Sequence, residues 1–205
     1  QLSYLFAEEK ISTVYLETAS VTLDFFGALS RKLGGISVSS DSRIQRFILK
    51  QRSIKSAEEA GKIKEAQKMT DETFSYILDR IAAGRTEREV MLDMEFFMRR
   101  LGSEGTAFDF IVVSGRNSSL PHGVPTDKKI QKGDFVTMDF GAVCGGYRSD
   151  MTRTVAVGGV SEKQRNVYET VLAAQKKTIE YIKPGVICKD VDRVARDIIA
   201  GAGYD

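Results

Sequence analysis

Two aspartates stand in neighbouring segments whose alternating residues are typical of β-strands. Asp139 lies within residues 135–140 and Asp150 within residues 147–157, and a glycine-rich turn joins the two segments into an expected hairpin. Aspartate is among the residue types least suited to a strand, and an ionised one is rarely buried without a partner. The two carboxylates are therefore candidates for chemistry.

The register of the hairpin decides how close the two carboxylates lie. A turn centred on residues 144–145 would place Asp139 directly opposite Asp150. A turn centred on residues 145–146 would place Asp139 opposite Thr152 and leave Asp150 as a diagonal neighbour. In both registers the carboxylates share one face, because side chains alternate between faces of a sheet. Directly opposed β-carbons are about 4.5–5.5 Å apart, so two bare carboxylates there would repel each other.

A divalent cation, a nearby arginine or a shared proton would relieve that repulsion. Arg148 and Arg153 flank Asp150 in the second segment and are the alternatives to a metal ion. The spacing alone leaves a metal site and a structural network of ion pairs both open.

His122 is the only histidine of the chain, and it lies in an expected loop between Pro121 and Pro125, ahead of the hairpin. Imidazole titrates near neutral pH, so a role in proton transfer is a hypothesis for this side chain, although a lone loop histidine usually has no such role. No nucleophile motif of a serine or cysteine triad accompanies it. The hairpin glycines join two strands and therefore do not form a phosphate-binding loop.

Three capping boxes predict the starts of the helices that surround the hairpin. The pairs are Ser56 with Glu59, Thr86 with Glu89, and Ser161 with Gln164. Helical spacing predicts two inward faces, made of Ile63, Ala66, Thr70, Phe74, Ile77, Leu78 and Ile81 in the first helix and Val90, Met94, Phe97, Met98 and Leu101 in the second. A further strand is expected over residues 108–113, and the third helix is expected to reach Ile182.

The helix pair recurs at a constant offset of 101 residues, which aligns Gly84 with Gly185 and Gly102 with Gly203. The first helix of the later copy is expected to be four residues shorter, about one turn. A chance likeness of two amphipathic helix pairs is the alternative. As a true repeat, the second copy lacks its sheet, so we expect roughly 50 further residues of sheet beyond the chain. Because the chain also begins at Gln1, we expect truncation at both ends.

The first 52 residues predict a small α/β piece that would be a poor domain alone. The expected strands are 13–16 and 36–38, and the expected helices are 23–33 and 42–50. The polar stretch 50–55 is the expected boundary, which divides the chain into domains 1–52 and 53–205.

The composition excludes several classes of protein. The net charge of +2 comes from 30 basic and 28 acidic side chains scattered along the chain, so neither nucleic acid nor a membrane surface is an expected partner. No apolar run approaches the roughly 18 residues of a membrane span. Only Cys144 and Cys188 are present, without metal-site spacing, which favours reduced thiols and a cytoplasmic location.

Several blocks, in this order, resemble the pita-bread metallopeptidases (family M24), and within them the Xaa-Pro aminopeptidase and Xaa-Pro dipeptidase branch. The blocks are residues 114–123, Gly133-Asp134, residues 139–141 and residues 149–154. The resemblance covers residues 53–205, about three quarters of the chain, and residues 1–50 resemble the end of the smaller amino-terminal domain of that branch. It implies an α+β pita-bread (creatinase/aminopeptidase) fold, incomplete here, preceded by the end of a small α/β domain.

The resemblance also implies a role for each candidate residue. Asp139 matches a ligand of one metal ion, Asp150 matches the aspartate that bridges two, and His122 matches a histidine beside the substrate that assists proton transfer or holds the scissile carbonyl. The family completes its site with one histidine and two glutamates further on, none of which this chain contains. We therefore expect weak or absent metal binding and no activity from the chain alone. The implied ions are two divalent metals, manganese with cobalt or zinc as alternatives.

The implied function is hydrolysis of the bond between an amino-terminal residue and proline, by water that two metal ions activate. The implied substrates are peptides with proline at the second position, and the implied assembly is a homodimer. Methionine aminopeptidase and creatinase-like C–N hydrolysis are alternatives within the fold. A non-catalytic peptide- or histone-binding module, whose known relatives typically lose the metal-binding aspartates, and a short interaction protein are alternatives of another class.

Overall fold

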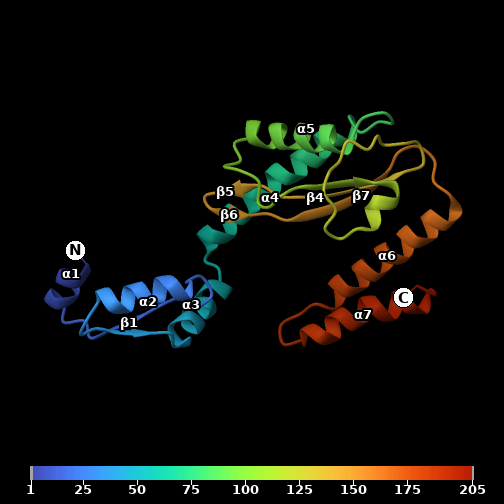
Figure 1. Cartoon of the computed structure of the whole chain (residues 1–205). Helices are drawn as coiled ribbons and strands as arrows, with labels where there is room; N and C mark the ends of the chain where they lie inside the picture. Colours follow the sequence, from blue (N-terminus) through green and yellow to red (C-terminus); the bar gives the residue numbers. More distant parts are fainter. Residues whose placement is uncertain (1, 205) are drawn as a thin grey trace. The chain divides into compact units, whose positions relative to one another are not determined.

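Residues 2–204 are described in this computed structural model, and they fall into two units that divide between residues 60 and 61 (Figure 1). The first unit contains two short parallel strands, in which Val14 pairs with Val38. Its elements are α1 (Leu2–Glu8), β1 (Thr13–Tyr15), α2 (Leu23–Lys32), β2 (Ser37–Ser39) and α3 (Arg43–Ser53). Thr22 starts α2 by accepting a hydrogen bond from the Phe25 amide, as a helix N-cap does.

The expected α/β character of this first unit is confirmed, with two corrections. The helix α1 was not expected from the sequence. Helix α3 continues to Ser53, so residues 50–53 are helical and not a linker. The stretch Lys50-Gln51-Arg52 is made of good helix formers, and its polarity marks an exposed helical surface. The expected domain boundary between residues 52 and 53 stays a prediction.

The second unit is built around the three-stranded antiparallel sheet β3–β4–β7. The strands are β3 (Ile111–Ser114), β4 (Phe135–Phe140), β5 (Val143–Cys144), β6 (Tyr147–Arg148) and β7 (Met151–Ala156). The helices are α4 (Ala57–Leu78), whose first four residues belong to the first unit, α5 (Glu87–Arg100), the short 3-10 helix η1 (Gly115–Ser119), α6 (Glu162–Tyr181) and α7 (Cys188–Gly201). Among the described residues, no helix has both the length and the apolar character that a bilayer crossing requires.

The core of the second unit lies between the sheet and the helices α4 and α5, which run along one side of it (Figure 1). The fully buried side chains come from all of these elements: Ala66, Ile77, Val90, Met94, Met98, Val112, Val136, Met138 and Phe140. The helical spacing therefore predicted the inward faces well. Leu78 is the exception, because it is the last residue of α4 and is 45% exposed.

All three predicted capping boxes are present, and each satisfies an amide that the first helical turn leaves unpaired. Ser56 and Glu59 exchange bonds of 2.6 and 3.2 Å. The same reciprocal pattern joins Thr86 to Glu89 at the start of α5 and Ser161 to Gln164 at the start of α6.

The second helix pair predicted from the repeat is also present, as α6 and α7. The aligned glycines share a left-handed backbone, with φ of 97° at Gly84 and 89° at Gly185, and of 101° at Gly102 and 81° at Gly203. The first helix of the later copy was expected to be four residues shorter than that of the earlier copy. The helix itself accounts for only part of this difference, because α4 has 22 residues and α6 has 20. The rest of the difference lies in the segment that joins α4 to Gly84 and α6 to Gly185, which is shorter in the later copy.

Replacing Phe140 by alanine tests the position of this core. The ring is 0% exposed, so Phe140→Ala should lower the free energy of unfolding by about 3–5 kcal/mol through lost burial and a cavity. Phe96→Ala is the matched control, because Phe96 is 65% exposed and should change stability by less than about 0.5 kcal/mol. Urea unfolding of the intact protein measures both, and equal effects would contradict the assigned core.

Candidate metal centre

The hairpin register is the one in which the two aspartates are diagonal neighbours. Cys144 pairs with Tyr147 across the turn, and Asp139 pairs with Thr152. The central turn residues Gly145 and Gly146 have φ of 55° and 76°. A two-residue hairpin turn with positive φ at both positions favours glycine, which explains why the turn is centred on 145–146 and not one residue earlier.

The second segment of the hairpin is not one continuous strand, as the alternation predicted, but breaks at Ser149 and Asp150 between β6 and β7. Ser149 is buried, and its Oγ accepts a hydrogen bond of 2.9 Å from the Ala142 amide. The same hydroxyl lies 3.2 Å from the carbonyl of Ala66 and 2.6 Å from the Thr70 hydroxyl, both on α4. The break is thus fixed to a helix, and it places Asp150 outside the regular ladder.

Gly141 faces this break at a distance that no side chain could tolerate. A Cβ at this position would lie 2.0 Å from the Ser149 carbonyl oxygen. The close approach of the two backbones therefore requires glycine next to β4. This contact determines how far Asp150 stands from the strand that carries Asp139.

The arginines on either side of Asp150 form no ion pair with Asp139 or Asp150. Thr152 Oγ1 donates a hydrogen bond of 2.8 Å to Asp139 Oδ1. Arg148 Nη1 donates to the carbonyl of Ala107, and Arg153 Nη1 donates to the carbonyl of Thr152. Among residues 2–204, no lysine or arginine forms an ion pair with Asp139 or Asp150. The two arginines considered as alternatives to a metal ion therefore do not pair with either aspartate.

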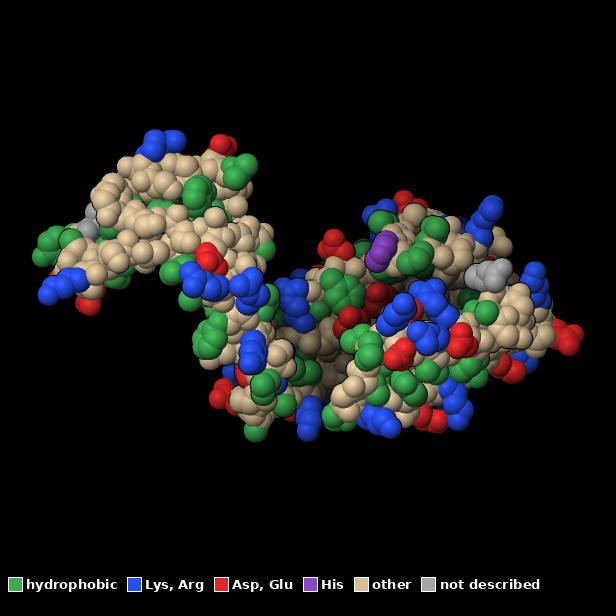
Figure 2. Space-filling model, turned by 90° about the horizontal axis from the view of Figure 1, so that it is seen from below, with side chains coloured by type: hydrophobic (Ala, Val, Ile, Leu, Met, Phe, Trp, Pro, Cys, Tyr) green, Lys and Arg blue, Asp and Glu red, His purple; other side chains and the backbone are tan. Residues whose placement is uncertain are grey.

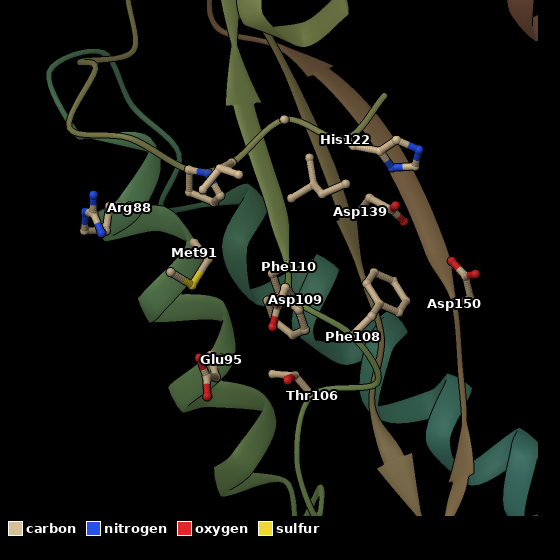
Figure 3. Close-up of a pocket in the computed structure, with 14 residues that line it drawn as sticks. Arg88, Met91, Glu95, Thr106, Phe108, Asp109, Phe110, His122, Asp139 and Asp150 are labelled. Carbon is tan, nitrogen blue, oxygen red and sulfur yellow. The ribbon is translucent and has the colours of Figure 1, made fainter. Parts of the chain in front are cut away.

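Asp139, Asp150 and His122 line the same pocket, which has a volume of about 710 Å³ (Figure 3). His122 lies on the same side of the pocket as the two aspartates, and Phe108 stands near them. His122 is exposed, and Figure 2 shows the single histidine in purple at the surface with acidic side chains near it. The loop, the hairpin and the segment before β3 thus bring together the three residues that the sequence singled out.

The opposite side of the pocket contains residues that the sequence reasoning missed. Met91 and Glu95 come from α5, and Asp109 comes from the segment before β3 (Figure 3). The expected strand over 108–113 was wrong at its start, because β3 begins only at Ile111. Asp109 had the same signal as Asp139, a carboxylate within an alternating apolar segment.

The chemistry of the pair suits a divalent cation. Carboxylate oxygens are the donors that manganese and similar hard ions prefer, and both aspartates offer oxygens on the same face of the hairpin. Within the described part of the chain, no cluster of three or more histidine, cysteine, aspartate or glutamate side chains could by itself hold a metal ion. Among the described residues, the pair alone is therefore not a complete set of metal ligands.

Comparison with known proteins gives a consistent family and fold. The model of Metallopeptidase family M24 matches residues 61–205. The chain is similar to the Xaa-Pro dipeptidase of Pyrococcus horikoshii, with 40% identity over 198 residues that cover 97% of this chain and 55% of that protein. It spans about half the length of the curated relatives it matches.

Two solved structures show the same arrangement of elements. The Xaa-Pro dipeptidase from Bacillus anthracis matches with a TM-score of 0.93 and 38% identity, over 99% of this chain and 56% of that one. The X-Pro aminopeptidase from Thermotoga maritima matches with a TM-score of 0.91 and 36% identity, over 99% and 57%. The expected α+β pita-bread fold, only part of which this chain contains, is confirmed.

Replacing Gly141 by alanine tests the close approach that places Asp150. The added methyl group would push the Ser149 backbone away, and overpacking of this kind costs about 1–3 kcal/mol or more. Gly105→Ala is the control, because a Cβ there meets no atom within 4 Å. Thermal unfolding of the intact protein should show a lower midpoint for Gly141→Ala alone, and an unchanged midpoint would mean that the strands are farther apart.

Proposed function

This chain belongs to metallopeptidase family M24, and we propose that the intact protein hydrolyses the bond between an amino-terminal residue and proline with the help of two divalent metal ions. The observation that supports this proposal is the meeting of Asp139, Asp150 and His122 around one pocket. The relatives named above, which are Xaa-Pro dipeptidases and an X-Pro aminopeptidase, support the substrate class.

In this proposal Asp139 and Asp150 supply oxygen donors to the metal ions, together with the histidine and two glutamates that the resemblance implies. The Thr152 hydroxyl donates to one Asp139 oxygen, and the other oxygen would be available to hold an ion. Bound divalent ions supply Lewis-acid polarisation of a peptide carbonyl and a lowered pKa of water. Manganese is the proposed metal, since the two donors that this chain supplies are carboxylates, with cobalt or zinc as alternatives.

His122 is proposed to hold or move a proton at the peptide group. Its imidazole is exposed at the pocket, where it can reach a bound substrate and exchange protons with solvent. General acid–base catalysis by a positioned imidazole contributes about 10²–10⁴-fold to a rate. The apolar side chains of Phe108, Met91 and Val124 line the same pocket and would exclude water around the substrate.

The substrates of this proposal are peptides with proline at the second position, and the proposed assembly and location are a homodimer in the cytoplasm. Cys144 and Cys188 are both free thiols, which supports the location. Methionine aminopeptidase and creatinase-like C–N hydrolysis are the competing activities. A non-catalytic binding module is less well supported, because both aspartates and His122 are retained.

Replacing Asp150 by asparagine tests the metal ligands. Asp150→Asn in the intact protein should abolish release of the first residue from Xaa-Pro peptides and reduce bound manganese, because the amide carries no negative charge. Asp79→Asn is the matched control, since Asp79 is exposed and lies outside the pocket, and it should leave both unchanged. Metal analysis and peptide assays measure the two effects. Full turnover in Asp150→Asn would contradict the assignment of Asp150 as a metal ligand.

The same assay tests the substrate class. Wild-type protein loaded with manganese should cleave a peptide such as Ala-Pro-Ala faster than Met-Ala-Ala, and it should not hydrolyse creatine. A preference for Met-Ala-Ala or for creatine would favour the corresponding alternative. Metal binding without any turnover would favour a binding module.

Replacing His122 by alanine separates proton transfer from metal binding. His122→Ala should lower kcat by about 10²–10⁴-fold, while the manganese content stays at the wild-type level because His122 is not a proposed ligand. Loss of metal in this variant would instead indicate that His122 is a ligand. An unchanged kcat would remove the imidazole from the mechanism.

A further inference from the structure

Glu87 is a fully buried carboxylate for which the proposed chemistry has no use. It is the first residue of α5 and is 0% exposed. Among the described residues, no lysine or arginine forms an ion pair with it. A buried charge is costly unless it is fully hydrogen-bonded, so the bonds that Glu87 accepts indicate what it does.

Both oxygens of Glu87 accept hydrogen bonds, and each oxygen bonds a different end of one loop. Oε1 accepts from the Ser114 amide at 2.7 Å and from the Ser114 hydroxyl at 2.9 Å. Oε2 accepts from the Thr126 amide at 3.1 Å and from the Thr126 hydroxyl at 2.7 Å. Burial raises the pKa of Glu87, but the hydrogen bonds from Thr126 and Ser114 outweigh it and hold the pKa below its ordinary value.

The loop between these two ends carries His122. Ser114 is the last residue of β3, and residues 115–125 run through η1 and His122 before Thr126. In Figure 3 this chain segment passes from the start of α5, near Arg88, to His122 beside Asp139. Gly123 lies so close to the sheet that a Cβ would be 2.7 Å from Cγ1 of Val113. The loop is therefore held at both ends and pressed against β3.

Further hydrogen bonds near Glu87 also hold the ends of the 115–125 loop. Lys128 Nζ donates to Ser114 Oγ at 2.7 Å and to Asp134 Oδ2 at 2.9 Å. The Arg88 amide donates to the Thr126 carbonyl at 3.1 Å. The Arg88 bond ties the return of the loop to the start of α5, and the Lys128 bonds join the residues after the loop to Ser114 and Asp134. Among these side chains, Glu87 is the one that bonds both Ser114 and Thr126.

We propose that Glu87 is a positioning residue for His122, which joins the two ends of the 115–125 loop and thereby fixes the imidazole beside the aspartate pair. This inference rests on the proposed role of His122. It assigns control over the position of the proposed proton-transfer group to a buried residue that does not line the pocket.

The hydrogen-bond pattern requires a carboxylate and not an amide. Two of the four donors are backbone N–H groups, which cannot turn around to accept a bond. In Glu87→Gln the amide nitrogen would face either the Ser114 or the Thr126 amide, and two donors would meet without an acceptor. One end of the loop should then be released, while the shape of the buried side chain is kept.

The experiment compares Glu87→Gln with Met98→Ala in the intact protein loaded with manganese. Met98 is 1% exposed on the same helix and belongs to the core beneath the sheet, so its truncation lowers stability without touching the loop. Thr126→Val removes one hydroxyl donor and serves as a milder second variant. Hydrogen exchange of residues 115–126, manganese content and the kinetics with an Xaa-Pro peptide are measured for each.

In Glu87→Gln we expect faster exchange over residues 115–126 and unchanged manganese content. We also expect kcat to fall roughly tenfold or more, because misplacing a catalytic group by about 1 Å can cost about 10²-fold. Thr126→Val should change exchange and kcat in the same direction by less. Met98→Ala should lower the unfolding midpoint but keep the wild-type exchange of the loop and the wild-type kcat.

Unchanged exchange of residues 115–126 in Glu87→Gln would overturn the proposal, as would faster exchange with a wild-type kcat. An equal loss of kcat in Met98→Ala would also overturn it, because general destabilisation would then explain both. A wild-type protein that cleaves no Xaa-Pro peptide would instead defeat the proposed function. Even then, the hydrogen exchange of residues 115–126 in Glu87→Gln would test the role of Glu87 in holding the loop, because faster exchange would support that role and unchanged exchange would overturn it.

Discussion

The register of the β4–β7 hairpin fixes the position of both aspartates, and most of the second unit is arranged around it. The two carboxylates are diagonal neighbours on one face of this antiparallel pair, and the surrounding contacts impose their position. Three features impose it. The turn is confined to Gly145 and Gly146 by their positive φ, the backbone next to Gly141 approaches Ser149 without room for a Cβ, and Ser149 is bonded to Ala142 and α4.

The position of the two carboxylates bears on the chemistry that we propose for them. Neither neighbouring arginine pairs with the two carboxylates, because Arg148 and Arg153 donate to main-chain carbonyls instead. A divalent cation converts the repulsion into attraction, since each carboxylate then faces a positive charge. The diagonal register also leaves Asp139 opposite Thr152, whose hydroxyl donates to one oxygen of the carboxylate and leaves the other for the proposed metal ion.

The side of the pocket that carries His122 depends on a different kind of interaction. Here a buried, ionised Glu87 satisfies four donors from two chain positions that lie 27 and 39 residues away in the sequence. The hairpin thus places the proposed metal donors, and the start of α5 places the loop. The hairpin and α5 pack on the same core, which consists of α4, α5 and the sheet. The position of His122 relative to the aspartates is therefore set by the packing of this core and not by contacts of these three side chains.

The sequence predicted the residues of the site better than their surroundings. The aspartates could be found because aspartate is unusual within a strand pattern, and the roles of the aspartates and of His122 were implied by blocks that resemble a known family. The capping boxes were equally readable, since their bonds join residues only three positions apart.

Interactions between distant segments could not be predicted. The break at Ser149 depends on α4, about 80 residues earlier in the chain. Glu87 resembles any acidic residue in the first turn of a helix, and its partners Ser114 and Thr126 carry no signal that points back to it. The late start of β3 and the position of Asp109 in the pocket likewise follow from packing, because alternation alone made residues 108–113 look like one strand.

Anomalous X-ray diffraction from crystals of the intact protein, grown with manganese, would test the central claim most directly. The account predicts anomalous density between the carboxylates of Asp139 and Asp150, with Thr152 still bonded to Asp139. Manganese bound elsewhere in an active protein, with either aspartate paired to Arg148 or Arg153, would contradict it.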